Sequence, residues 1–254
     1  MKKVMNVLIG ITILLLIWQG IVLTGRYEEA LLPSPITVFT GTLELIKDGS
    51  LFEHIAVSLM RFSIGYFSAI IVAVILGIFL GWVTPIWDIV DPIVQVLRPI
   101  SPMAWLPFIV LWFGIGDIPA IVIIFIAAFF PVLLSTVSGV KRIDKTYLKV
   151  SENFGISGMN LFTKVIFPAA FPSITNGIHM ALGAAWIFLV AGEMVGAQSG
   201  LGYLVIDSRN SMRTDHLLSA IIFIGIIGLV LDKLLKFVES LIESKWGQRL
   251  GEGE

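Results

Sequence analysis

The chain has 254 residues, of which 57% are hydrophobic and only 14% are charged, and its mean hydropathy is +0.95. Soluble domains typically carry about 25% charged residues, so this chain cannot cover itself with charge and we expect lipid to cover it. The net charge of −1 gives no indication of nucleic-acid binding, and the absence of cysteine excludes disulfides, a thiolate nucleophile and a cysteine metal site.

Apolar runs follow one another along residues 1–254, which predicts a single, all-α transmembrane domain of about six helices. A helix needs about 20 apolar residues to cross the hydrocarbon core of a bilayer. The first run follows two lysines and lacks a small-residue cleavage site, so we interpret it as an uncleaved span rather than a signal peptide. The expected spans are residues 4–23, 57–81, 99–113, 118–139, 172–196 and 217–238.

Basic residues predict the orientation of the spans. With the N-terminus in the cytoplasm, twelve of the seventeen lysines and arginines lie inside and four outside, while Arg61 lies within a span. Short cytoplasmic loops carry the excess of positive charge, so both termini are expected in the cytoplasm. Region 24–56 is then outside, with a surface helix over 36–48. The inner set is Lys2, Lys3, Arg98, Lys141, Arg142, Lys145, Lys149, Lys164, Lys233, Lys236, Lys245 and Arg249; the outer set is Arg26, Lys47, Arg209 and Arg213.

The longest cytoplasmic loop, about 140–171, has the pattern of a helical hairpin. Tyr147, Val150 and Phe154 share one helical face, and Gly155 then interrupts the helix. A second short helix with five apolar residues is expected to be capped by Ser157 and closed by Pro168. Its apolar side chains are Met159, Leu161, Phe162, Val165 and Ile166. The hairpin either lies on the bilayer or under its own bundle, or it docks a cytoplasmic partner.

The same loop contains Lys149-Val150-Ser151, then Gly155, then Val165 and Phe167-Pro168. This spacing resembles the EAA signature of ABC-transporter permeases. The glycine and the final proline sit at the family spacing, whereas Lys149 stands where the family usually has glutamate and Ser151 replaces an alanine.

Further motifs lie along the chain: Ser58-Leu59-x-Arg61, Asp91-Pro92, Arg98-Pro99-Ile100-Ser101-Pro102-Met103-Ala104-Trp105-Leu106-Pro107, Leu111 to Asp117, Ala191-Gly192-Glu193-Met194 and Gly200-Leu201-Gly202-Tyr203. In these motifs the chain is similar to one branch of these permeases, the nitrate, sulfonate and taurine importers. The similarity covers about residues 30–240.

The resemblance implies the type I ABC-importer permease (MetI-like) architecture in a bacterial-type inner membrane. It implies that loop 149–168 is the coupling element for two cytoplasmic ATP-binding subunits, with Gly155 permitting the bend. It also implies a second permease copy, a homodimer in the simplest case, and an extracytoplasmic solute-binding protein that reaches outer loops such as 198–216. The implied coupling residues are Lys149, Val150, Ser151, Phe154, Gly155, Ser157, Val165, Phe167 and Pro168.

Several residues are candidates for the translocation pathway. Prolines interrupt the third span, and irregular backbone at membrane depth must line water or be buried in protein. Glu193 is an ionisable group within a span, which is expensive unless it faces a pathway or a partner; a structural pair with Arg61 is the alternative. The candidate pathway residues are Pro102, Trp105, Pro107, Trp186 and Glu193. The pairs Gly77-x-x-x-Gly81 and Gly196-x-x-x-Gly200 are interpreted as helix-packing sites.

The sequence contains no Gly-x-x-x-x-Gly-Lys-Ser/Thr loop, no His-Glu-x-x-His and no Gly-x-Ser-x-Gly. We therefore expect no catalytic residue, metal or cofactor in this chain, with ATP and Mg²⁺ on partner subunits. The expected cargo is a small anion such as nitrate, sulfonate or taurine. The alternatives are a pyrimidine vitamin precursor or riboflavin carried by the same type of permease, or a different class, an ion-coupled secondary carrier.

Overall fold

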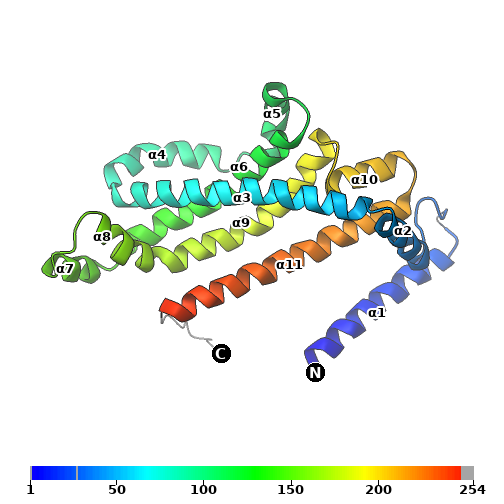
Figure 1. Ribbon diagram of the computed structural model, residues 1–254, viewed down its shortest axis with the longest axis horizontal. Helices are drawn as coiled ribbons and strands as arrows, with labels where there is room; N and C mark the ends of the chain where they lie inside the picture. Colours follow the sequence, from blue (N-terminus) through cyan, green and yellow to red (C-terminus); the bar gives the residue numbers. More distant parts are fainter. Residues whose placement is uncertain (1, 27, 247–254) are drawn as a thin grey trace.

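The computed structural model describes residues 2–26 and 28–246, and all regular structure in these ranges is helical. The long helices run roughly along the longest axis of the molecule (Figure 1). The hairpin that contains α7 and α8 projects at one end, here called the hairpin end, while α2 and α10 lie toward the other end, here called the opposite end.

The elements in chain order begin with α1 (Lys2–Leu23), α2 (Pro35–Lys47), α3 (Ser50–Trp82), α4 (Thr84–Leu97), η1 (Pro102–Trp105) and α5 (Leu106–Phe113). They continue with α6 (Asp117–Lys141), α7 (Lys145–Asn153), α8 (Met159–Leu161), η2 (Phe162–Ile166), α9 (Phe167–Gly196), α10 (Leu201–Asn210) and α11 (Thr214–Trp246).

Four helices are long and apolar enough to cross a membrane, and they correspond to four of the expected spans. They are Ser50–Trp82, Asp117–Lys141, Met159–Gly196 and Thr214–Ile242. A bent pair, α4 with Pro102–Phe113, can make a fifth span, and α1 adds a shorter apolar stretch, Leu8–Leu23. The prediction of an all-α membrane protein with about six apolar helices therefore agrees with the described fold.

The third expected span, residues 99–113, covers only the break and the second half of the bent helix pair. The first half is α4, which lies between the expected second and third spans. Asp88, Asp91 and Gln95 make α4 too polar to stand out by hydropathy. The halves meet at 85°, and the break contains Pro99 and precedes Pro102; proline lacks the N–H that would continue a helix.

Arg98 consequently does not belong to a loop between spans. It caps α4 after fourteen helical residues, which rise about 21 Å from Thr84. Pro107, in contrast, stands in the first turn of α5, where a missing N–H leaves no hydrogen bond unmade. Without Arg98, eleven basic residues remain on the proposed inner side against four outside, and the orientation of the termini stays a prediction.

The core of the bundle is formed by α3, α6 and α9, which pack closely along their lengths. Gly77 and Gly81 of α3 face α6, where a Cβ atom would come within 2.6 Å of Thr136 Cβ and 2.8 Å of Val140 Cβ respectively. The predicted packing role of this pair is confirmed. Gly196 and Gly200 do not form such a site, because Gly200 lies beyond the end of α9 with φ of +101°.

α11 lies on the outside of this core, and only 11% of its most apolar 18-residue stretch is buried. Among the described residues, the side chains of Trp186 and His179 of α9 make polar contacts with α11. The Trp186 indole N–H donates to the carbonyl of Ile224 at 3.1 Å. His179 lies between Asp232 and Glu239, with ring-nitrogen distances of 3.0 and 3.2 Å to their carboxylates.

The substitution Gly77→Val should lower the stability of the purified protein by about 1–3 kcal/mol, because the added side chain overpacks the α3–α6 contact. Thermal unfolding in detergent measures the effect. Gly183→Val is the matched control, since Gly183 is also helical but a Cβ there meets nothing within 4 Å. Equal destabilisation by both variants would show that helix propensity, rather than packing, decides the result.

Candidate functional site

The hairpin begins with α7, whose first turn is held by Asp144. The Asp144 carboxylate accepts a hydrogen bond from the backbone N–H of Thr146 at 2.8 Å. This N-cap contact keeps the pKa of Asp144 below its usual value, since the N–H favours the charged carboxylate. The cap fixes where α7 starts after α6 ends at Lys141, and so it sets the direction of the hairpin.

Gly155 ends α7 in a Schellman motif. Its φ is +68°, and the N–H of Ile156 donates to the carbonyl of Ser151 while the N–H of Gly155 donates to that of Glu152, both at 2.9 Å. Together these bonds satisfy carbonyls at the helix end and turn the chain sharply. Glycine is favoured here because other residues are strained at positive φ, so the structure places Gly155 at the bend that the sequence indicated.

The second arm differs from the prediction in two respects. Ser157 does not cap the short helix; Gly158 occupies the N-cap position and no side chain bonds to the helix there. Pro168 does not close the helix either, because α8, η2 and α9 form one helix of 38 residues, Met159–Gly196. The wider π-helical turn η2 ends two residues before Pro168. Its altered hydrogen-bond pattern lets the helix continue although proline has no backbone N–H to donate.

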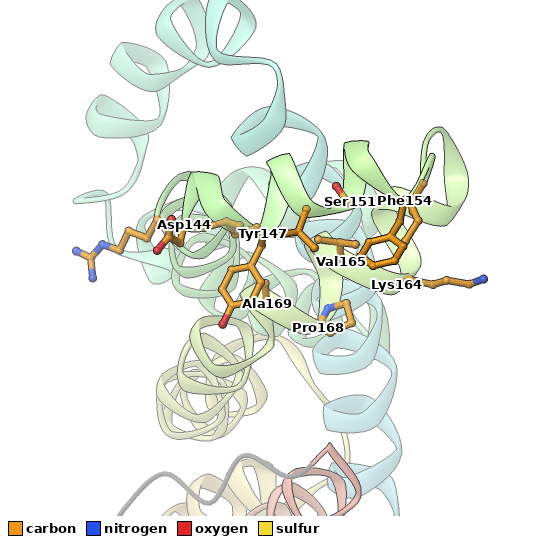
Figure 2. Close-up of a pocket in the computed structure, with 12 residues that line it drawn as sticks. Asp144, Tyr147, Ser151, Phe154, Lys164, Val165, Pro168 and Ala169 are labelled. Atoms are coloured by element: carbon orange, nitrogen blue, oxygen red, sulfur yellow. The ribbon is translucent and has the colours of Figure 1, made fainter.

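The two arms enclose a cavity of about 520 Å³. Figure 2 shows Tyr147 and Phe154 of the first arm on the side of Val165 and Pro168 of the second. Val150 also lines the cavity. Tyr147 is 62% exposed and Phe154 is 78% exposed in the isolated chain. The predicted apolar face of α7 is therefore present, and the bundle itself does not cover it.

The other predicted hairpin residues differ in their exposure. Lys149 is exposed, Ser151 is buried and its hydroxyl donates to the carbonyl of Leu148 at 2.7 Å. Val165 and Phe167 are half-buried. Lys149, at the position of the usual family glutamate, thus presents a positive charge to the outside of the hairpin.

A buried ionic network lies at the far ends of the same core helices. The guanidinium of Arg61 uses all five of its N–H groups: toward Asp117 (2.5 and 2.8 Å), Glu193 (2.8 Å), and the carbonyl and hydroxyl of Ser199 (2.6 and 2.8 Å). Arg61 is 1% exposed and Glu193 is fully buried. The network joins α3, α6, α9 and the segment that leads into α10.

The carboxylate of Glu193 has hydrogen-bond donors of three kinds. It accepts from the Ser58 hydroxyl (2.8 and 2.9 Å), from Arg61, and from the backbone N–H of Gly202 (2.9 Å). A Cβ on Gly200 would overlap this carboxylate, so glycine permits the close approach. The structure therefore forms the Arg61–Glu193 pair that the sequence analysis kept as the alternative to a pathway role.

The remaining pathway candidates separate into two groups. Pro102 lines a second cavity of about 470 Å³ between the break and helices α6 and α9. Trp105 and Pro107 flank the same break in η1 and α5. Trp186 is buried between α9 and α11 and does not line that cavity. The sequence analysis missed Arg98 and Met180 as lining residues, because only the fold brings them beside α6.

An exposed ionic cluster joins α2 to the start of α11. Arg213 lies 2.6 Å from Glu44 and 2.8 Å from Asp215, and His216 lies 3.3 Å from Glu44. The hydrogen bond from Arg213 lowers the pKa of Glu44. Because Arg213 bonds to carboxylates of both elements, the cluster links α2 to the start of α11.

Comparison with known families decides the assignment of this architecture. Residues 37–247 match the family model described as the binding-protein-dependent transport system inner membrane component. The chain belongs to this family. The permease is thus a transport subunit of an ABC importer and a multi-pass membrane protein, as the EAA-like hairpin indicated.

Two relatives and one solved structure illustrate the similarity. The permease is 36% identical to the nitrate import permease protein NrtB of Synechocystis over 94% of this chain and 90% of the relative. It is 32% identical to the taurine transport system permease protein TauC of Escherichia coli over 90% and 85%. A chain of the inward-facing MetNI methionine ABC transporter shares the fold, with a TM-score of 0.63 and 19% identity over 77% of this chain and 95% of that one.

The substitution Glu193→Gln should destabilise the permease by about 3 kcal/mol, because it leaves the buried Arg61 charge short of a counter-charge. Asp117→Asn is the control: the Asp117 side chain is 53% exposed, so its loss should cost about 1 kcal/mol or less. Thermal unfolding and transport are measured together. Normal stability with lost transport in Glu193→Gln would contradict the structural role and favour a pathway role.

Proposed function

We propose that this permease is the membrane subunit of an ATP-driven importer for a small anion of the nitrate, sulfonate or taurine type. The observation that carries the proposal is the hairpin, in which uncovered aromatic and aliphatic side chains surround a cavity at one end of the bundle. An uncovered apolar surface of this kind marks an interaction site. The full sequence has no phosphate-binding loop, so the proposal places ATP and Mg²⁺ on a partner.

The proposed assembly contains two copies of the permease, two cytoplasmic ATP-binding subunits and an extracytoplasmic solute-binding protein. A two-fold pair is the commonest closed arrangement of identical subunits. Each ATP-binding subunit docks on one hairpin, Lys149 to Pro168, and both termini of the permease lie in the cytoplasm. The solute-binding protein docks at the opposite end, where α10 and the Arg213 cluster lie (Figure 1).

The proposed mechanism is alternating access. ATP binding draws the two ATP-binding subunits together, and the hairpins move with them. Because Met159–Gly196 is one continuous helix, movement of the hairpin also moves the far end of the bundle. ATP shifts the conformational equilibrium only to the extent that it binds one conformation more tightly than the other. The permease itself makes and breaks no covalent bond.

The choice of a small anion rests on the relatives. NrtB is named for nitrate and TauC for taurine, and both align with nearly the whole chain. Nitrate and the sulfonate group of taurine each carry several oxygens and a negative charge. Both therefore suit a site with N–H donors.

Purification of the tagged permease from its native membrane in mild detergent tests the assembly. A P-loop ATPase in near-equal amount is the expected companion, identified by mass spectrometry, and a co-purifying solute-binding protein provides the handle for ligand screening. Repeated recovery of the intact permease alone, or only with itself, would contradict the proposal and would make ion-gradient-driven uptake the next assay.

The substitution Gly155→Val should uncouple transport from ATP hydrolysis or prevent docking of the ATP-binding subunit. A β-branched residue at φ of +68° is strained by about 1–3 kcal/mol, which opens the Schellman turn. The measurement is substrate-stimulated hydrolysis and uptake in the reconstituted complex.

Gly25→Val is the matched control for this variant. Gly25 has φ of +64°, and a Cβ at either glycine meets nothing within 4 Å, so the two variants carry similar strain in different places. Normal coupled uptake by Gly155→Val, or equal uncoupling by Gly25→Val, would count against a specific coupling role for the hairpin.

A further inference from the structure

Arg98 is an unpaired cation beside the cavity at the break between α4 and η1. No ion pair or hydrogen bond of its side chain is found in the part of the chain that the structure describes. The nearest acid before it on α4 is Asp91, two helical turns earlier. Its carboxylate accepts from the Gln95 side chain at 3.1 Å and makes no ion pair with Arg98 in the described part of the chain. This contrasts with Arg61, whose five N–H groups all have partners.

Arg98 is exposed in the isolated chain, and its position along the bundle is what makes the missing partner informative. It follows about 21 Å of helix, and it lines the cavity opposite Phe130 and Ser138 of α6 and Met180 of α9. Those residues belong to the helices that are long and apolar enough to span a membrane. An unpaired arginine at such a depth is expensive unless it faces water or a ligand, and so it marks a functional site.

The chemistry of the cavity fits a small oxyanion. Among the described residues that line it, Arg98 is the only charged one, and Ser135 and Ser138 add hydroxyl donors to an otherwise apolar wall. The described lining residues include no carboxylate that would repel an anion inside the cavity. The planar guanidinium presents parallel N–H donors that match two oxygens of one ligand. The volume of about 470 Å³ is ample for nitrate or for an alkanesulfonate.

We propose that Arg98 is the anion-binding residue of the translocation pathway, where it holds the oxygens of nitrate or of a sulfonate during passage. This inference rests on the proposed function and adds the residue that recognises the charge of the cargo. A single guanidinium in an open-sided cavity suits transport, because binding must be favourable enough for entry and weak enough for release. Ser135 and Ser138 complete the hydrogen-bonding shell from α6.

The first test measures whether position 98 faces water. The chain contains no cysteine, so Arg98→Cys creates a unique label site in the full-length permease in liposomes. We expect rapid reaction with a water-soluble, sulfonate-bearing methanethiosulfonate reagent, because the inference places this position beside an aqueous cavity. Val96→Cys is the control, since Val96 is 68% exposed on the same helix yet does not line the cavity. Failure of Arg98→Cys to react faster than Val96→Cys would overturn the inference.

The second test measures the charge requirement. ATP-dependent uptake of nitrate and taurine by the complete reconstituted transporter should fall about tenfold or more in Arg98→Gln, the loss expected for a hydrogen bond to a charged group, and less in Arg98→Lys. Lys233→Gln, which removes an exposed cation from α11, should have no effect. Treatment of Arg98→Cys with an aminoethyl methanethiosulfonate, which restores a positive charge, should recover uptake, whereas a neutral methyl reagent should not.

The outcomes separate the two proposals. Absence of ATP-dependent uptake of either anion by the unmodified transporter contradicts the proposed function itself. Uptake by the unmodified transporter together with unchanged uptake in Arg98→Gln, or equal rescue by the neutral and the cationic reagents, overturns the role of Arg98 alone.

Discussion

The contacts of Arg61 are the constraint on which the arrangement of the core helices depends. A buried guanidinium must find partners for its N–H groups and a compensating charge, and here the partners come from α6, α9 and the segment before α10. Removal of one partner from such a network is costly, which fixes these ends relative to one another. Along the rest of their length the same helices need only close, apolar packing, which Gly77 and Gly81 permit. The contacts of Arg61 therefore fix how the ends of the core helices are placed, and Gly77 and Gly81 allow α3 to approach α6 closely.

The sequence predicted the parts of this fold that depend on local pattern. Hydropathy located four long spans, the spacing of Tyr147, Val150 and Phe154 located the apolar face of α7, and Gly155 located the bend. Helix α4 was missed because its polar residues lower its hydropathy. The continuous helix through Pro168 was missed because proline normally ends a helix, and only the π-helical turn before it removes the conflict. The cap at Gly158 depends on backbone geometry that no side-chain pattern encodes.

The candidate site shows the same division between local and assembled information. Arg61 and Glu193 are 132 residues apart, and the sequence offered their pairing only as one of two interpretations. For Arg98, an arginine followed by proline in a broken apolar run was visible in the sequence, but the absence of a neighbouring carboxylate was not, because it depends on which faces of α6 and α9 lie opposite. Two arginines of the same chain thus have contrasting surroundings: one is surrounded by acids and the other stands beside hydroxyls and apolar groups.

The unbroken helix from Met159 to Gly196 has a consequence for how this subunit can change shape. One residue of extra winding or unwinding at η2 would rotate every side chain beyond it by about 100°, and Glu193 would then point away from Arg61. The ionic contacts at one end of this helix therefore also fix its orientation about its own axis at the other end, beside the hairpin. While these contacts persist, the helix can tilt or shift as a unit, but it cannot rotate about its own axis. A conformational change that keeps the Arg61–Glu193 bond must therefore move this helix without rotating it about its axis.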